Sequence, residues 1–324
     1  WPAKTNYLYL TYGGETNDIE INESDKGVIV LGAGPYRIGS SVEFDWGTVN
    51  MVWGLQENGE KNVSVVNCNP ETVSTDYDIC SRLYFEELTL ERILDIAEFE
   101  NPKGIVTSVG GQTANNLTPN LAKNGINLIG TSAENIDRAE NRSKFSEILD
   151  NLHIKQPLWQ AFSNITDAKN FALDVGYPVL VRPSYVLSGA AMKVVWSQEE
   201  LKEFVTNAAV VSPDYPVVIT KFMLDSLEVD VDGVSDGKNV VIGAIVEHID
   251  SAGVHSGDAM MCIPPWRISN KIIENITDST VRIAREFKIK GPFNLQFLIN
   301  NDQEYVIELN IRASRSMPFV SKLV

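Results

Sequence analysis

Short apolar runs alternate regularly with amphipathic stretches in the first part of the chain. Each apolar run has the length and the β-branched residues of a buried strand, and the stretches after them have helical spacing. This order predicts an α/β domain with a parallel sheet, helices on both faces and glycine-rich turns at the carboxyl ends of the strands. The predicted strands are 28–31, 63–67, 104–109 and 127–130, and the predicted helices are 44–57, 90–98 and 113–124.

The rhythm changes after a helix predicted over residues 139–152. Strand-like runs then follow one another closely, and a single helix around 198–205 separates three of them. Parallel strands need long crossovers, so this density predicts antiparallel sheets. The fold class is therefore predicted as α/β followed by α+β. The strands predicted in this second part are 177–182, 191–196, 216–222, 228–234, 240–246, 293–297 and 304–308.

Length and charge limit the class of protein. A chain of 324 residues can bury a large core and is expected to form roughly two or three subdomains. A polar lead-in segment, 1–25, carries an aromatic stripe at Tyr7, Tyr9 and Tyr12 and is expected to pack on the surface. The net charge of -16 argues against a nucleic-acid surface, which needs clustered Lys and Arg, but allows a nucleotide site. The first residue is not Met, so a piece of a longer chain is expected.

The cysteines and the hydropathy pattern favour a cytoplasmic protein. Cys68, Cys80 and Cys262 are odd in number and widely spaced, as expected of reduced thiols and not of a disulfide frame or zinc site. No apolar run is long enough to span a bilayer, and the first residues lack a signal-peptide pattern. We therefore expect no membrane partner.

The strongest candidate for chemistry lies on the last predicted strand. Alternate side chains of a strand share a face, so Glu308, Asn310 and Arg312 point the same way. Two hard oxygen ligands beside a guanidinium fork suit Mg²⁺ and a triphosphate. The neighbouring run at 293–297 could bring Gln296 to the same ion. For any one of these residues alone, a solvated strand face is the better interpretation.

Two loops of small residues add candidates. Arg182 precedes the loop at 183–192, whose backbone amides could approach phosphates, although an ordinary hairpin loop is an equal alternative. The loop at 253–258 holds His255, and a lone loop histidine is more often structural than catalytic. No Ser–His–Asp order or metal-ligand spacing lies nearby, so nucleophilic hydrolysis is not supported.

Charged residues also stand at the ends of the intervening strands. Lys221 closes one strand, and Glu228 opens the next with Asp230 and Asp232 on the same face. The turn at 32–39 suggests a dinucleotide site only weakly, because its third glycine is too late and Pro35 disturbs it. An oxidoreductase is therefore a minor alternative.

Six long segments resemble the carbamoyl phosphate synthetase large chain. The resemblance covers nearly everything after residue 26. That family has two homologous ATP-grasp halves, of which the first phosphorylates bicarbonate and the second carbamate. The wording at Asn69-Pro-Glu-Thr-Val-Ser and Pro318-Phe-Val-Ser-Lys is similar to the second half, and Ser188-Gly-Ala-Ala and Asn310-Ile-Arg look eukaryotic. The segments are 34–45, 66–78, 110–113, 182–189, 252–258 and 314–322.

The resemblance implies a pre-ATP-grasp domain at 26–138 and an ATP-grasp domain at 139–324, with a lid at about 155–222. It also implies roles for individual residues. Lys221 and Ile311 depart from the bacterial pattern, at positions where a backbone carbonyl or an ordinary strand residue can serve. The implied nucleotide-binding residues are Arg142, Arg182, Lys221, Met223, Glu228, Gly253, Val254, His255, Ser256, Gln296 and Glu308; the implied metal ligands are Gln296, Glu308 and Asn310; the implied catalytic residues are Asn310, Arg312 and Arg315.

The implied activity is that of an ATP-grasp ligase that makes carbamoyl phosphate from carbamate and ATP with Mg²⁺ or Mn²⁺. The implied partners are the first synthetase half, a glutaminase and an effector domain, and a mitochondrial location stays open beside the cytoplasm. Arginine and pyrimidine synthesis are both open as pathways. The alternative is a non-catalytic nucleotide-binding or assembly module.

Overall fold

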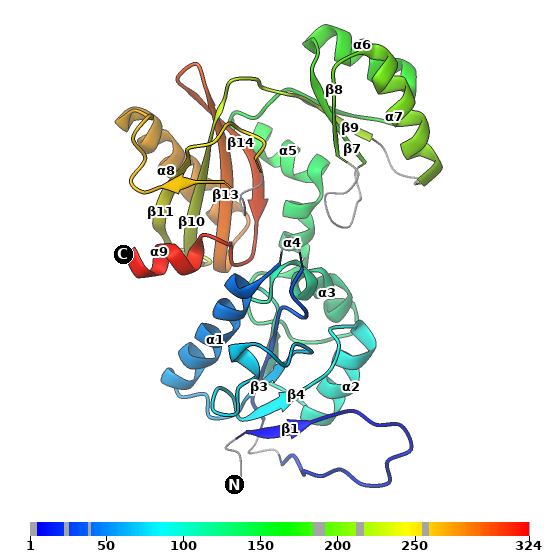
Figure 1. Cartoon of the computed structure of the whole chain (residues 1–324), viewed down its shortest axis with the longest axis vertical. Coiled ribbons are helices and arrows are strands. Elements are labelled where there is room, and N and C mark those ends of the chain that lie inside the picture. Colours follow the sequence, from blue (N-terminus) through cyan, green and yellow to red (C-terminus); the bar gives the residue numbers. More distant parts are fainter. Residues whose placement is uncertain are drawn as a thin grey trace.

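The computed structural model describes residues 5–22, 26–37, 40–183, 192–211, 217–254 and 259–323. Within them, the strands form three sheets (Figure 1). A parallel sheet with helices on its faces lies at the bottom of the view. An antiparallel sheet beside α8 lies at the upper left, and a smaller one beside α6 and α7 lies at the upper right. Helices α4 and α5 stand between these bodies, so the three sheets surround the middle of the molecule.

The first sheet has the strand order β1-β4-β3-β2-β5, with every pair parallel. Its strands are apolar on both sides because helices cover both faces. In β2, Val28 and Val30 pack in one cluster with residues of α1, whereas Ile29 and Leu31 pack in another with residues of α2 and α3. The α/β prediction is confirmed.

The edges of this sheet differ from the predicted elements. Residues of the lead-in segment form strand β1, which pairs with β4, a strand absent from the prediction. The strand predicted at 127–130 is reduced to a single bridge between Ile105 and Leu128. Gly110 allows the start of α3 to approach the end of β2, since a Cβ there would lie 2.3 Å from Gly32 O.

The two other sheets are antiparallel, as predicted. The larger has the order β12-β11-β10-β13-β14, and the smaller has the order β6-β9-β7-β8. Isoleucines of α8, such as Ile276 and Ile283, pack with Val229 and Val231 of β10. Helix α8 is not among the elements predicted above, although Ser269 caps it and its isoleucines recur at helical spacing.

The helix predicted over 139–152 is mostly α5, and α4 before it was not predicted. Asn141 separates the two helices: this residue ends α4, and its side-chain oxygen accepts a hydrogen bond from Lys144 N as the N-cap of α5. Asparagine can cap a helix or lie within one, so the residue type alone does not mark this boundary. The break matters because Arg142 becomes the first residue of α5.

The helices are α1 (Val42–Glu57), α2 (Leu90–Glu100), α3 (Gly111–Lys123), α4 (Ala133–Glu140), α5 (Arg142–Asn151), α6 (Ile165–Val175), α7 (Gln198–Val211), α8 (Asn270–Glu286) and α9 (Met317–Leu323), with a 3₁₀ turn, η2 (Val73–Thr75). The strands are β1 (Asn6–Leu8), β2 (Val28–Leu31), β3 (Val63–Val66), β4 (Arg82–Tyr84), β5 (Gly104–Val106), β6 (Trp159–Phe162), β7 (Val179–Pro183), β8 (Lys193–Val195), β9 (Val217–Lys221), β10 (Leu227–Asp236), β11 (Val240–His248), β12 (Met261–Cys262), β13 (Lys290–Asn300) and β14 (Gln303–Asn310).

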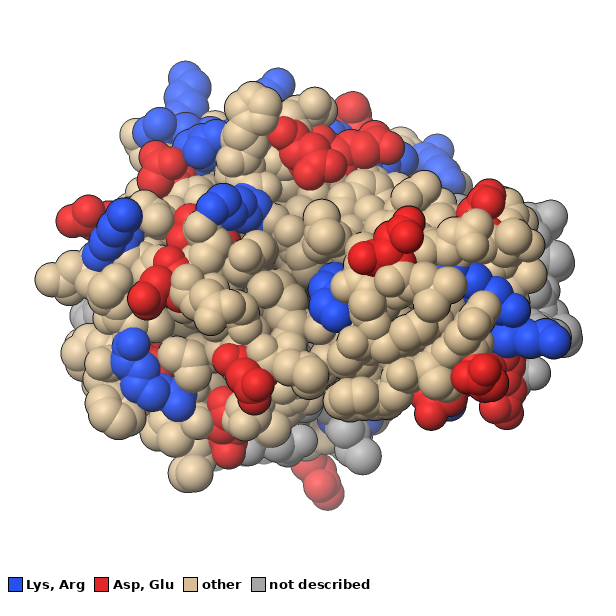
Figure 2. Space-filling view, turned by 90° about the horizontal axis from the view of Figure 1, so that it is seen from above, with Lys and Arg blue, Asp and Glu red and all other residues tan. Residues whose placement is uncertain are grey.

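Charges of both signs share one face of the molecule. Figure 2 views the molecule from above and shows Lys and Arg side chains interspersed with Asp and Glu, without a continuous basic area on this face. Among the described residues, no helix combines the length and apolar character needed to cross a bilayer.

Candidate functional site

A polar row crosses the antiparallel sheet on the face away from α8. Asp230 of β10 pairs in register with Gln296 of β13, and Gln296 pairs with Glu308 of β14. The residues one position along each of these strands point into the α8 core, as alternation requires. The structure thus brings Gln296 and Glu308 together. Glu308 is exposed, so its carboxylate is open to a ligand.

A second row lies directly beside the first. Asp232, Asn294 and Asn310 pair across the same three strands. Asn294 Nδ2 donates to Asp232 Oδ1 at 3.0 Å. Asn310 Oδ1 accepts from Arg312 Nη2 at 3.1 Å and keeps a second lone pair. Gln296, Glu308 and Asn310 therefore form a patch of oxygen donors of the kind that Mg²⁺ or Mn²⁺ prefers.

Two arginines near this patch have side-chain nitrogens without hydrogen-bond partners among the described residues. Arg142 is buried, and only its Nη1 is paired in the described structure, donating to Ile307 O at 2.5 Å. Among the described residues, Arg142 Nε and Nη2 and Arg182 Nε are buried without a hydrogen-bond partner. Burial lowers the pKa of Arg142 to about 9, Arg182 adds to this, and Glu308 opposes it. Unpaired buried donors are rare in native structures, so this pair of guanidinium groups is suited to an anion.

Arg312 is held by several elements at once. Its Nε donates to Gln112 Oε1 at 2.9 Å, and its Nη1 donates to Ala313 O at 3.0 Å. Its guanidinium carbon lies 5.6 Å from the centroid of the Phe44 ring in α1. Burial lowers the pKa of Arg312, and Glu308 partly offsets this. Gln112 and Phe44 were not predicted, because both come from the parallel-sheet domain.

Arg315 reaches the same domain by another contact. Its Nε lies 3.6 Å from Glu43 Oε1, at the start of α1. Arg312 and Arg315 are therefore both placed at the junction between the parallel-sheet domain and the larger antiparallel sheet. A planar guanidinium there can offer a fork to a phosphoryl or carboxylate group.

The predicted nucleotide residues lie on the other side of the patch. Glu228 Oε2 accepts from Gly253 N at 3.2 Å, and burial raises the pKa of Glu228. Gly253 has a φ of 98°, which favours glycine, and Val254 after it is exposed. Lys221 Nζ donates to Gly176 O at 2.7 Å, so this amine holds the turn before β7. His255, Ser256 and the loop at 184–191 lie outside the described residues.

Met223 belongs to a cavity between the strand linkers. Its volume is about 340 Å³, enough for a planar heterocycle. Its lining mixes apolar side chains with polar and charged ones. The lining includes Phe222, Met223, Leu227, Ile249, Ala252 and Arg267.

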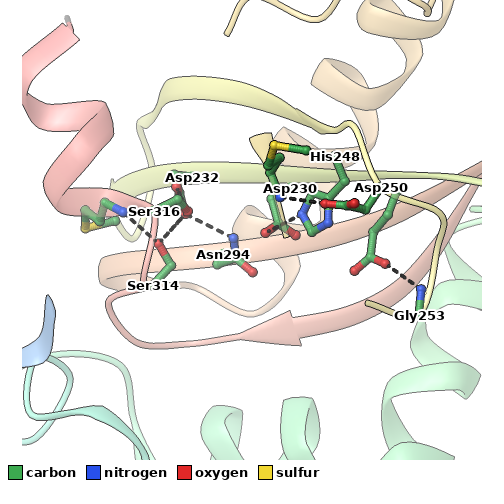
Figure 3. Close-up of polar contacts among 11 residues, drawn as sticks. Asp230, Asp232, His248, Asp250, Gly253, Asn294, Ser314 and Ser316 are labelled. Carbon is green, nitrogen blue, oxygen red and sulfur yellow. Dashed lines mark hydrogen bonds and ion pairs between the residues drawn. The ribbon is translucent and has the colours of Figure 1, made fainter. Parts of the chain in front are cut away.

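A buried acidic group beside the site was only partly anticipated. Figure 3 shows Asp230 against His248, with 3.3 Å between Asp230 Oδ2 and His248 Nε2. Burial opposes protonation of His248, but the hydrogen bond and charge of Asp230, together with the charges of Glu228 and Asp250, raise the His248 pKa. With Glu228 these residues form a cluster whose ligand atoms lie within 4.8 Å of one another. Strand alternation gave the shared face, but no sequence signal gave the histidine.

The glycine-rich turn does not present a dinucleotide cradle in its described part. Gly32 N donates to Val66 O at 2.9 Å, and Gly34 N donates to Asn67 Oδ1 at 3.1 Å. These amides are thus already paired within the protein.

Comparisons with known proteins cover nearly the whole chain. The family model of the carbamoyl phosphate synthase preATP-grasp domain matches residues 24–138, and that of the carbamoyl-phosphate synthase L chain ATP binding domain matches residues 137–324. The carbamoyl phosphate synthase large chain of Saccharolobus solfataricus is 51% identical over 99% of this chain and 30% of its own length. The mitochondrial carbamoyl-phosphate synthase [ammonia] of Rattus norvegicus is 54% identical over 99% of this chain and 21% of its own. The chain thus spans less than a third of the length of these relatives.

Solved structures with low sequence identity share the fold. The biotin carboxylase of Campylobacter jejuni, in a β-γ-ATP complex, has a TM-score of 0.72 at 18% identity over 92% of this chain and 68% of its own. The biotin carboxylase domain of Hydrogenobacter thermophilus 2-oxoglutarate carboxylase, with MgADP, ADP and bicarbonate, has a TM-score of 0.72 at 16% identity over 91% of this chain and 66% of its own. The fold is a pre-ATP-grasp domain followed by an ATP-grasp fold, as predicted.

Proposed function

Because this chain belongs to the carbamoyl phosphate synthase large-chain family, we propose that it transfers the γ-phosphoryl group of ATP to carbamate and so forms carbamoyl phosphate. The family's relatives are ligases with an ATP-binding domain. The finer assignment to the carbamate step rests on sequence motifs at 69–74, 182–185, 253–256 and 318–322 that resemble the second synthetase half. The division at 26–138 and 139–324, with a lid at about 155–222, is part of the same proposal.

One observation carries this proposal. An oxygen-donor patch of Gln296, Glu308 and Asn310 lies near Arg142 and Arg182, which have unpaired nitrogens among the described residues, and near the junction arginines Arg312 and Arg315. Arg142 and Arg182 have spare donors for the phosphates, and Arg312 and Arg315 stand where an acceptor anion would arrive. Such an arrangement separates a nucleotide side from an acceptor side.

The donor set fits a divalent metal ion. Gln296, Glu308 and Asn310 would hold Mg²⁺ or Mn²⁺, which would neutralise charge on the phosphates when bound. The exposed carboxylate of Glu308 supplies the anionic ligand, and the two amides supply neutral oxygens.

The protein's own residues would act by positioning and charge compensation. A carbamate oxygen forms a bond to the γ-phosphorus in line with the breaking bond to the β-phosphate, and ADP leaves with the electron pair. Carbamate is already an anion, so no general base is required. Arg142 and Arg182 would hold the phosphates, and Arg312 and Arg315 would orient the transferring group and the carbamate. Glu228, Gly253, Val254, His255 and Ser256 would hold the nucleoside side, with Met223 against the base and Lys221 bracing the turn before β7.

The partners of the whole enzyme belong to the same proposal. The curated relatives are more than three times as long as this chain, which leaves room for a first synthetase half and an effector domain. A glutaminase would supply nitrogen in the parent enzyme. Carbamate decomposes in water, so it would reach this site from the first half without release.

The reverse reaction provides a direct test. The 324-residue chain is mixed with MgADP and carbamoyl phosphate, and ATP is measured by luciferase luminescence. ATP formation that depends on both substrates and is abolished by EDTA is expected. A parallel assay measures bicarbonate-dependent ATP hydrolysis, the reaction expected of the other half. Bicarbonate-dependent hydrolysis without ATP formation would reassign the chain to the first half. Tight ADP binding without either reaction would favour the non-catalytic module.

A further inference from the structure

Asp232 is a buried carboxylate on the site face of β10. Only 1% of its surface is exposed. It accepts hydrogen bonds from Ser314 Oγ at 2.6 Å and from Asn294 Nδ2 at 3.0 Å, both at Oδ1, and from Ser316 Oγ at Oδ2 (Figure 3). Both carboxylate oxygens are therefore engaged. A buried carboxylate needs such donors, because burial without them is costly.

The two serines belong to the segment that carries the junction arginines. Ser314 and Ser316 flank Arg315, and Arg312 lies two residues before Ser314. Ser314 Oγ also accepts from Met317 N at 3.2 Å, where α9 begins. One carboxylate thus fixes the connection between the end of β14 and the start of α9.

The same segment is tied on its other side to the parallel-sheet domain. Ala313 N donates to Ser108 O at 2.8 Å, between the two arginines. The segment is therefore suspended between a backbone carbonyl of one domain and the Asp232 carboxylate of the other. A single hydrogen bond would let the segment pivot, whereas contacts to both carboxylate oxygens restrict its rotation.

We infer that Asp232 is a positioning residue: by holding Ser314 and Ser316 it sets the place and direction of Arg312 and Arg315 at the acceptor side of the site. This inference rests on the proposed function for its catalytic meaning. Asp232 has no recorded contact with Arg142, Arg182 or Glu228 among the described residues. Its removal should therefore disturb the acceptor side and spare the nucleotide side.

The test compares three variants with the wild-type chain. The double variant Ser314→Ala/Ser316→Ala removes the two donors and leaves the strand intact. Asp232→Asn keeps the shape of the side chain, and serine hydroxyls can donate to its oxygen or accept from its nitrogen. The matched control is Ser279→Ala, a buried serine of α8 on the opposite face of the sheet.

We expect the double serine variant to lose about 10- to 100-fold in kcat for ATP formation, since small displacements of positioning groups have effects of this size. Its KM for carbamoyl phosphate should rise, while its Kd for MgADP stays within about twofold because distant sites act independently. Asp232→Asn should keep most of the wild-type kcat, because its amide can still hold both serines. In hydrogen–deuterium exchange, peptides covering 312–317 should exchange faster in the double variant, with β10 and β13 unchanged.

The inference requires that the double serine variant show both a lower kcat and faster exchange at 312–317. Wild-type kcat with faster exchange at 312–317 would overturn it, because the tether would then have no catalytic effect. Lower kcat with unchanged exchange would also overturn it. If the wild-type chain formed no ATP, the proposed function would fail by itself. The exchange measurement would still test whether Asp232 holds the segment through Ser314 and Ser316. Unchanged exchange at 312–317 would refute this, and faster exchange would support it.

Discussion

Arg312 Nε donates a hydrogen bond to Gln112 Oε1 at 2.9 Å, across 200 residues of sequence. Gln112 lies in the first turn of α3, in the parallel-sheet domain, and Arg312 follows β14 of the antiparallel sheet. Gln112 Nε2 in turn donates to Asn116 Oδ1 at 2.7 Å, so the glutamine is itself oriented. The acceptor side of the candidate site is therefore composite, and neither domain presents it alone.

Replacing Arg312 by Lys should expose the importance of this geometry. Lysine keeps the charge but loses the planar fork that reaches Gln112, Asn310 and Ala313 at once. We expect kcat for ATP formation to fall by about 10²- to 10³-fold, the range for loss of one oriented donor of transition-state charge. The control is Arg282→Lys on α8, whose half-exposed guanidinium pairs with Asp278 and lies away from the site. If Arg312→Lys formed ATP as fast as the control Arg282→Lys, the guanidinium of Arg312 would have no role in catalysis.

Glu308→Gln should separate catalysis from folding. The change keeps the shape but removes the anionic ligand, so higher Mg²⁺ should be needed for half-maximal ATP formation. The side chain is exposed, so the free energy of unfolding should change by no more than about 1 kcal/mol. Both quantities are measured by Mg²⁺ titration of the assay and by urea unfolding.

Glu304→Gln, on the same strand but away from the oxygen-donor patch, is the matched control for Glu308→Gln. It should keep the wild-type Mg²⁺ dependence. Parental ATP formation by Glu308→Gln at limiting Mg²⁺ would mean that Glu308 is not a ligand.

Arg142→Met should weaken nucleotide binding without lowering the stability of the nucleotide-free chain. The wild-type side chain buries two nitrogens without partners, so an apolar replacement of similar length should not lower the free energy of unfolding of the nucleotide-free chain. Binding of ADP raises the melting temperature in proportion to its affinity, and this increase should be lost. Differential scanning fluorimetry with and without MgADP measures both.

The control for Arg142→Met is Arg138→Met in α4, which breaks an ion pair with Glu286 and should keep the ADP-induced increase. A full ADP response in Arg142→Met would show that the unpaired nitrogens of Arg142 do not face the nucleotide.

The sequence predicts those parts of the site that depend on local geometry. Alternation along one strand placed Glu308 and Asn310 on one face, since a period of two needs no knowledge of the fold. It also suggested that Gln296 on a neighbouring strand could join them, but it gave neither the exact register nor the pairing with Asp230, because register across strands is set by distant residues and by the irregularity at Gln296/Phe297.

The sequence also could not predict contacts between segments that are far apart along the chain. Gln112 lies in a segment that the resemblance had marked, yet its meeting with Arg312 depends on how the two domains dock. The Ser314 and Ser316 contacts to Asp232 likewise join segments 82 and 84 residues apart. The start of α5 was predicted too early because asparagine can cap a helix or lie within one, so Asn141 did not mark the boundary by its residue type alone.

The last prediction concerns stability at alkaline pH. Cys80 is 5% exposed, and burial raises the pKa of its thiol from 9.0 to about 12. The folded chain therefore keeps a proton that the unfolded chain releases. The stabilisation is fully present below pH 9 and is lost as the pH rises through about 12. In that window the thiol should lower the free energy of unfolding by up to about 1.4 kcal/mol per pH unit.

Urea unfolding at several pH values between 8 and 11, followed by tryptophan fluorescence, measures this slope, estimated at about one proton per molecule. Cys80→Ala should be less stable at pH 8, because it leaves a small cavity, but its stability should fall less steeply above pH 9. Cys262→Ala is the comparison, since that thiol is only half-buried and its removal should change the slope less. Identical slopes for the wild type and Cys80→Ala would show that the Cys80 thiolate is tolerated in the folded chain, and that other groups, such as the buried Tyr84 phenol, set the alkaline limit.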